Sequence, residues 1–262
     1  MNSIKNSKAF AIDMDGTFFL GQRLLPGALD FLAMLNARGI PFSFLTNNSS
    51  KSPEDYHRKL IGLGVAAEDA RVYTSGEATI AYLHRKHPGK HVFLLGTGSL
   101  AEQFKNAGVL LDEESPEVAV LGYDTGLTYP RLTRFCDLVR AGLTYIATHP
   151  DVNCPVEGGF APDTGAFIAL IEASTGRKPD VIIGKPNPLI IAGLAERFGV
   201  SPDEIVMVGD RLYTDIALGT TAGVGTVLVL SGETKHGDLV TSAYQPDLVC
   251  EDLAELTKFL SN

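Results

Sequence analysis

Two carboxylates stand two positions apart at the end of a short apolar run. Residues 10–12 are apolar, and Asp13 and Asp15 follow them just before Gly16. Short apolar runs suit the buried strands of parallel sheets, whose carboxyl edge is where ligands bind. Because two acids this close repel each other, we expect a hard divalent cation such as Mg2+ beside them. One acid then suits nucleophilic attack on phosphorus, and the other suits proton transfer.

Three further apolar runs also end in polar or charged side chains. Hydroxyl and amide groups can hydrogen-bond phosphate oxygens, a lysine adds positive charge, and further acids can bind or support a metal ion. These side chains are Thr46 and Asn47 after 42–45, Lys185 after 181–184, and Asp210 with Asp215 after 205–209.

The four strand ends together resemble the haloacid dehalogenase-like (HAD) phosphohydrolase superfamily, and the match runs from Asp13 to Asp215. The resemblance implies hydrolysis of phosphate monoesters through an aspartyl-phosphate, with Asp13 as the nucleophile and Asp15 as the acid and base. Lys185 is the catalytic cation that this mechanism requires.

The resemblance also implies the ligands of the metal ion and of the phosphoryl group. Mg2+ is held by the side chains of Asp13 and Asp210 and by the backbone carbonyl of Asp15, with Asp215 as a supporting residue. Phosphoryl binding falls to Thr46 and Asn47. The hydroxyls that follow, Ser49 and Ser50, are assigned mainly to capping the next helix.

The spacing of these motifs predicts two domains. About 30 residues separate Asp15 from Thr46, which is enough for one crossover helix. About 140 residues separate Thr46 from Lys185, too many for one crossover, and they carry their own alternation of strand and helix patterns. We predict an α/β fold: a Rossmann-like, doubly wound parallel-sheet core at 1–76 and 180–262, with an inserted α/β cap domain at 77–179. The insert resembles the type-two cap of the NagD-like and 4-nitrophenyl phosphatase group.

The longest polar irregular stretch, 148–159, contains His149 and Asp151. Long loops often carry function, and the resemblance implies that this part of the cap selects the leaving group. Both residues are therefore candidate substrate contacts. The resembling group usually has Asn where this chain has His149, which leaves the substrate open. His149 is alternatively a solvated loop residue.

Composition limits the partners and the compartment. A net charge of −9 over 262 residues disfavours nucleic acid and anionic membranes. Three scattered cysteines fit a reducing cytoplasm. The polar N-terminus lacks the apolar core of a signal peptide, and no run reaches the roughly 20 apolar residues of a membrane span. The expected partner is a small-molecule phosphate ester, and caps of the resembling group can mediate a homodimer.

Other functions fit parts of the pattern. A phosphomutase on the same scaffold is not separable by sequence. A non-enzymatic phosphate-binding regulator also places acids and a lysine at strand ends, although the large insert and Asp15 argue against it. A dehalogenase needs neither a metal nor a second acid, so Asp15 and Asp210 together disfavour that reaction.

Overall fold

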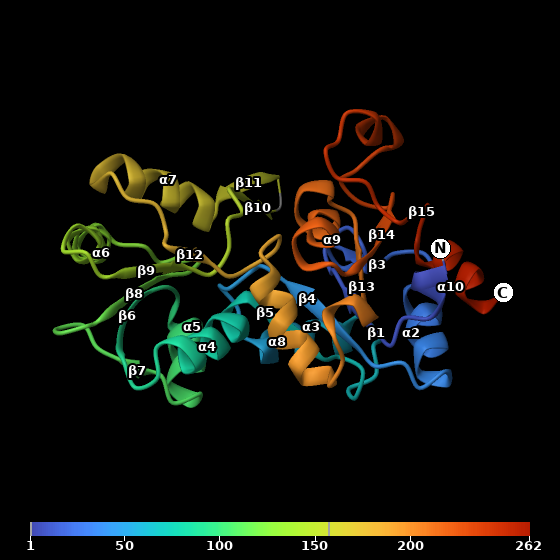
Figure 1. The fold of residues 1–262 in the computed structure, drawn as a ribbon, viewed down its shortest axis with the longest axis horizontal. Helices are drawn as coiled ribbons and strands as arrows, with labels where there is room; N and C mark the ends of the chain where they lie inside the picture. Colours follow the sequence, from blue (N-terminus) through green and yellow to red (C-terminus); the bar gives the residue numbers. More distant parts are fainter. Residues whose placement is uncertain (1, 157) are drawn as a thin grey trace. The chain divides into compact units, whose positions relative to one another are not determined.

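The computed structural model describes residues 2–156 and 158–262, and the chain divides into two compact units (Figure 1). The core unit comprises Met1–Thr46, Pro53–Tyr73 and Lys185–Asn262. The insert unit comprises Asn47–Ser52 and Thr74–Gly184. The domain limits expected at 76/77 and 179/180 stay a prediction. The sequence reasoning did not foresee that Asn47–Ser52 clusters with the insert unit.

The core unit is built on a six-stranded sheet in the order β15-β14-β13-β1-β4-β5. The central strand β1 pairs in parallel with β13 on one side and β4 on the other. The strands are β1 Ala9–Ile12, β4 Phe42–Thr46, β5 Val72–Thr74, β13 Ile205–Gly209, β14 Gly225–Val229 and β15 Leu248–Cys250. The α-helices are α1 Asn2–Lys5, α2 Ala28–Ala37, α3 Pro53–Gly62, α8 Pro188–Phe198, α9 Ala217–Ala222 and α10 Leu253–Ser261.

Alternating side chains of the core strands pack against helices on two faces. Phe10 and Ile12 of β1 share one buried cluster with Phe31 of α2, Leu60 of α3 and Leu256 of α10. On β14, Val227 belongs to that cluster, whereas the next residue, Leu228, packs against the π-helical turn η2, Leu212–Ile216. Helices therefore cover both faces, and the predicted doubly wound α/β class is confirmed.

Shorter elements complete the core unit. The strands β2, Phe19–Leu20, and β3, Arg23–Leu24, form a hairpin shortly after the first acids. Two 3-10 turns precede strands in the sequence: η1, Pro202–Glu204, comes before β13, and η3, His236–Val240, comes before β15.

The insert unit has its own parallel sheet, in the order β12-β9-β8-β6-β7. Phe93, Phe135 and Tyr145 lie in the buried cluster that joins this sheet to α6 and α7. The strands are β6 His91–Leu95, β7 Leu110–Leu111, β8 Val118–Leu121, β9 Thr144–Ala147 and β12 Val181–Ile182. The helices are α4 Ser75–Lys86, α5 Gly98–Asn106, α6 Tyr129–Arg140 and α7 Thr164–Thr175.

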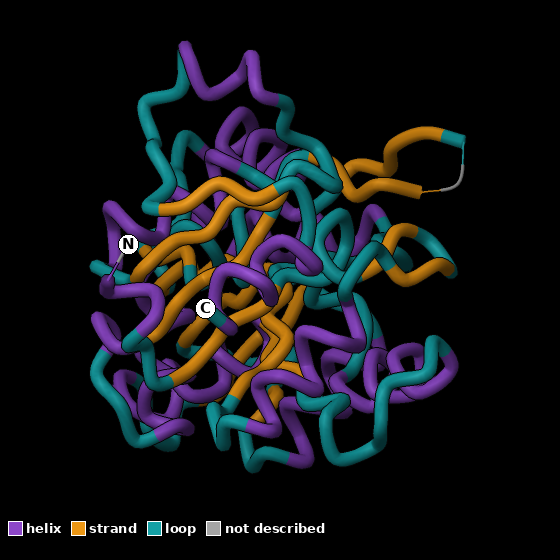
Figure 2. The backbone as a smooth tube through the Cα atoms, turned by 90° about the vertical axis from the view of Figure 1, so that its right-hand side faces the viewer, coloured by secondary structure: helices purple, strands orange, loops and turns teal. Residues whose placement is uncertain are grey.

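Two sequence expectations about this region are wrong. The run at Val181–Ile182 was expected in the core sheet, but β12 pairs with β9 at the edge of the insert sheet. The stretch 148–159 was expected to be irregular. It contains β10, Asn153–Val156, which pairs antiparallel with β11, Gly159–Pro162; this hairpin stands at the upper right of Figure 2. Glu157 of that stretch lies outside the described residues.

Among the described residues, no helix combines the length and the apolar character needed to cross a membrane.

Candidate active site

The side chain of Lys185 lies in the core unit between two acids. Its Nζ donates to Asp13 Oδ1 at 2.5 Å and to Asp215 Oδ1 at 2.7 Å, and it lies 3.4 Å from the carbonyl oxygen of Leu45. The Lys185 side chain is only 4% exposed and that of Asp215 is 0% exposed. An acid directly after β1 and an acid in η2 thus share one ammonium group.

Asp210 follows β13 and is held by backbone groups of a neighbouring loop. Its Oδ2 accepts from the amide of Glu233 at 2.7 Å, and its Oδ1 lies 3.4 Å from Thr17 Oγ1. A Cβ atom on Gly16 or on Gly232 would overlap the Asp210 carboxylate. This carboxylate therefore occupies a space that exists only because two neighbouring positions are glycine.

Three acids form one cluster with an excess of negative charge; Asp210 and Asp215 are buried, and the Asp13 side chain is 14% exposed. Oxygen atoms of Asp13, Asp210 and Asp215 lie within 4.8 Å of one another. When ionised, they bring three negative charges against the positive charge of Lys185, while the nearby Arg211 is ion-paired with Glu233 at 3.0 Å. An all-oxygen donor set with unbalanced negative charge fits a hard divalent cation.

Burial and charge perturb the ionisation of this cluster. Burial raises the pKa of Asp13 well above its usual range; Lys185 opposes the shift, and Asp215 and Asp210 add to it. Burial, reinforced by Asp215, raises the pKa of Asp210 to about 6. For Lys185, burial lowers the pKa, but Asp13 and Asp215 outweigh burial and leave the pKa above its usual value. The lysine therefore stays charged, and additional positive charge would favour the ionised acids.

Asp15 is placed differently from the three clustered acids. Its side chain is 57% exposed, and its Oδ1 lies 4.0 Å from Lys59 Nζ of α3. Lys59 also lies over the ring of Phe19, 3.7 Å from its centroid. An exposed carboxyl group can exchange protons with water, as the predicted acid and base must. Thr46 ends β4 in the same unit and is half-buried.

The other predicted substrate-binding residues lie together in the insert unit. Asn47 Nδ2 donates to Asp151 Oδ1 at 3.1 Å. His149 is 0% exposed, so the alternative of a solvated loop residue is wrong. Its Nδ1 lies 2.9 Å from Thr148 Oγ1 and its Nε2 2.9 Å from Asp163 Oδ1. Substrate contact by these residues stays a prediction.

Some residues around these positions were missed or misassigned by sequence reasoning. Ser49 was expected to cap a helix, but its Oγ accepts from the amide of Tyr123 at 2.9 Å and lies 3.0 Å from Thr148 Oγ1. The contacts of Gly232 and Glu233 with Asp210 were also missed. The sequence does contain a signal for these contacts. Ser231 and Gly232 follow the strand β14 closely, and β14 is parallel to β13, so its carboxyl end lies at the same sheet edge as Asp210.

Two family models match the chain. The haloacid dehalogenase-like hydrolase model covers residues 10–110, and the HAD-hydrolase-like model covers residues 182–256. An acid sugar phosphatase of Staphylococcus aureus is 37% identical over 253 residues, covering 96% of this chain and 97% of the relative.

Solved structures agree with these matches. A 4-nitrophenylphosphatase from Thermotoga maritima is 49% identical, with a TM-score of 0.94 and coverage of 98% of this chain and 99% of that one. NagD from E. coli is 33% identical, with a TM-score of 0.89 and coverage of 95% and 98%.

The space around Asp210 generates a test. In Gly232→Ala, the added methyl group must displace the Asp210 carboxylate. We expect kcat for 4-nitrophenyl phosphate to fall by about a hundredfold, the usual effect of misplacing a catalytic group by about 1 Å. Steady-state hydrolysis with matched circular dichroism spectra measures the effect.

Gly237→Ala is the matched control, because no atom lies within 4 Å of the Cβ it would add. Equal activity of the two variants would show that the position of the Asp210 carboxylate does not matter for turnover.

Proposed function

We propose a metal ion, a substrate class and a covalent mechanism for this chain, which belongs to the haloacid dehalogenase-like hydrolases and, within them, to the NagD-like phosphatases. In this proposal it hydrolyses small-molecule phosphate monoesters, foremost sugar phosphates, with Mg2+ as its cofactor. The observation that carries the proposal is the buried cluster of Asp13, Lys185, Asp210 and Asp215 at one sheet edge.

The excess negative charge of this cluster supports Mg2+. The side chains of Asp13 and Asp210 and the backbone carbonyl of Asp15 would hold the ion, and Asp215 would orient Lys185. When bound, Mg2+ supplies positive charge that neutralises the phosphoryl oxygens.

The carboxyl groups of Asp13 and Asp15 carry out the covalent steps of this proposal. An Asp13 oxygen attacks phosphorus, and the bond from phosphorus to the ester oxygen breaks. Asp15 gives its proton to the departing oxygen. Water then attacks phosphorus of the aspartyl-phosphate, Asp15 takes a proton from that water, and inorganic phosphate leaves while the Asp13 carboxylate is restored.

In this proposal the remaining residues bind the substrate and stabilise the transferred phosphoryl group. Lys185 and Thr46 counter the charge on the phosphoryl oxygens, which is the main task in phosphoryl transfer. Asn47 and Asp151 are proposed to contact the substrate. A sugar phosphate substrate is supported by the 37% identical acid sugar phosphatase. Three free cysteines support a reducing compartment such as the cytoplasm.

A phosphate-release screen tests the proposal directly. Purified protein with Mg2+ is incubated with a panel of sugar phosphates, nucleoside monophosphates and 4-nitrophenyl phosphate. We expect release of inorganic phosphate with a preference for sugar phosphates. Isomerised sugar phosphate without phosphate release would instead identify a mutase.

The nucleophile is tested with Asp13→Asn. A neutral amide is a poor nucleophile, so turnover should fall by at least about a thousandfold while the fold is kept. Asp30→Asn changes an exposed acid of α2 and serves as the control. A near-normal rate for Asp13→Asn would exclude the covalent route.

The metal is tested by chelation. Treatment with EDTA should abolish phosphate release, and Mg2+ should restore it. Ca2+ should restore it poorly, because Ca2+ prefers more ligands at longer distances. Full activity after thorough chelation, checked by elemental analysis, would contradict the metal assignment.

The proposed role of Asp15 as acid and base is tested with the variant Asp15→Asn on two substrates. A sugar phosphate has a strongly basic leaving oxygen that needs a proton, whereas 4-nitrophenolate departs with little protonation. In the pre-steady state, formation of the aspartyl-phosphate should therefore slow more for the sugar phosphate. Equal slowing for both substrates would remove Asp15 as the proton donor.

A further inference from the structure

His149 lies at the centre of a buried polar network within the insert unit. The side chains of Ser49, Thr148 and His149 are completely buried, and Asp163 is 3% exposed. They come from three places in the sequence: the segment after β4, the end of β9, and the N-cap of α7. One chain of hydrogen bonds therefore joins three segments of this unit.

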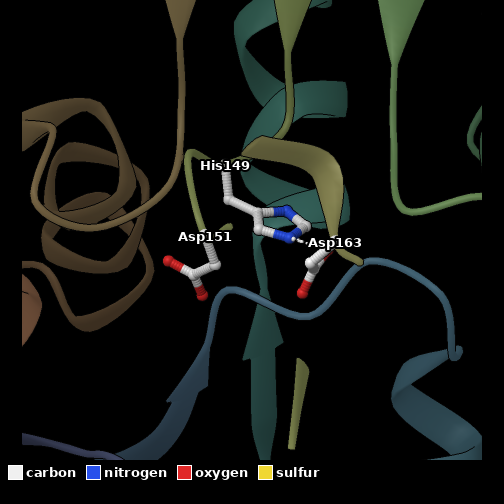
Figure 3. A group of neighbouring side chains, drawn as sticks. All are labelled: His149, Asp151 and Asp163. Atoms are coloured by element: carbon white, nitrogen blue, oxygen red, sulfur yellow. Dashed lines mark hydrogen bonds and ion pairs between the residues drawn. The ribbon is translucent and has the colours of Figure 1, made fainter. Parts of the chain in front are cut away.

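The groups at the two ends of the network fix the direction of its end bonds. The Tyr123 amide can only donate, so Ser49 Oγ accepts from it, and one further hydrogen bond joins Ser49 Oγ and Thr148 Oγ1. The Asp163 carboxylate accepts from His149 Nε2, as Figure 3 shows by the dashed line. With the ring proton on Nε2 alone, the hydroxyl of Thr148 donates to Nδ1, 2.9 Å away.

The network lies next to two predicted substrate contacts. Asp151 is two residues beyond His149; its side chain accepts from Asn47, and its carbonyl accepts from the Gly165 amide at 2.7 Å. A Cβ on Gly184 would lie 2.6 Å from Asn47 Oδ1 and 2.7 Å from His149 Cβ. Asn47, His149 and the backbone of Gly184 are thus closely packed against one another.

We propose that His149 is a positioning residue: it holds Asp151 and Asn47 in one arrangement and thereby sets the substrate preference. This inference rests on the proposed function, because Asp151 and Asn47 matter only if a phosphate ester binds there. His149 itself acts through its bonds to Thr148 and Asp163, not through substrate, since its ring is fully buried.

The same side chains have a second interpretation, a metal centre. Ligand atoms of His149, Asp151 and Asp163 lie within 4.8 Å of one another (Figure 3). Hydrogen bonding is favoured because Asp163 Oδ1 already accepts from three groups: His149 Nε2, the Thr164 amide at 2.6 Å and Thr164 Oγ1 at 3.2 Å. A metal ion would have to break the His149–Asp163 bond.

Three variants of His149 separate its two bonds. His149→Gln keeps an N–H group that reaches toward Asp163 but loses the acceptor at Nδ1. His149→Asn keeps an acceptor beside Thr148 but is too short for Asp163. His149→Ala removes both bonds. The matched control is His91→Gln, which removes an exposed histidine contact to Asp112, 2.7 Å long, in the same unit.

Kinetics and hydrogen exchange test the inference together. For a sugar phosphate, His149→Ala should raise KM about tenfold, the effect of losing a hydrogen bond to a charged group, while kcat changes less than about threefold. His149→Gln should recover most of the affinity, and His91→Gln should match the unaltered chain. Amide exchange at Tyr123 and Gly165 should quicken in His149→Ala only.

Several outcomes would overturn the inference. A uniform fall in kcat on all substrates with unchanged KM would indicate a purely structural residue. A tightly bound metal ion found by elemental analysis and lost in His149→Ala would identify a metal centre. Unchanged exchange at Tyr123 and Gly165 would show that His149 holds neither segment. If neither the unaltered protein nor any variant releases phosphate, the proposed function is wrong. The exchange data then still decide whether His149 positions the segments that contain Tyr123 and Gly165.

Discussion

The burial of one ammonium group between two carboxylates is the interaction on which the acid cluster of the core unit depends. A buried ammonium group without a partner would lose the free energy of its hydration. The ion pairs with Asp13 and Asp215 offset that loss. Lys185 and Asp13 are 172 positions apart in the sequence. Their ion pair therefore requires both segments of the core unit, one before and one after the insert, to be folded together.

Close approach of like charges makes a second demand on the core sheet. Carboxyl groups can gather at its edge only where the neighbouring backbone leaves space for them. Gly16 and Gly232 leave that space for Asp210, and Gly209 leaves it for Asp215, because a Cβ at each would overlap the carboxylate. The same geometry keeps the acids close enough to share a cation. Clusters of titratable groups with perturbed pKa values, such as this one, are common at functional sites.

The predictions that succeeded rest on a rule that needs no knowledge of packing. Parallel strands end at a common edge, so the polar residues after β1 and β13 had to meet. The run at Val181–Ile182 failed because two apolar residues suit either sheet, and only pairing with β9 decides. His149 could not be placed either. Its burial depends on Ser49 and Asp163, which lie far from it in the sequence and carry no local signal of that contact.

Charge balance separates the two clusters of metal-binding side-chain types in this protein. In the insert unit, a neutral imidazole can complete its bonds between a hydroxyl donor and the Asp163 carboxylate, and Asp151 is bonded to an amide. Nothing there calls for an added cation. In the core unit, Asp13 and Asp215 share one lysine and Asp210 lies beside them, so the three acids, when ionised, carry more negative charge than Lys185 balances. A buried polar cluster that is complete by itself serves to hold shape, whereas one left with net charge is prepared for a ligand of the opposite sign. By this criterion we assign the proposed ion to the core cluster, and to the His149 network the proposed task of keeping the neighbouring polar residues in place.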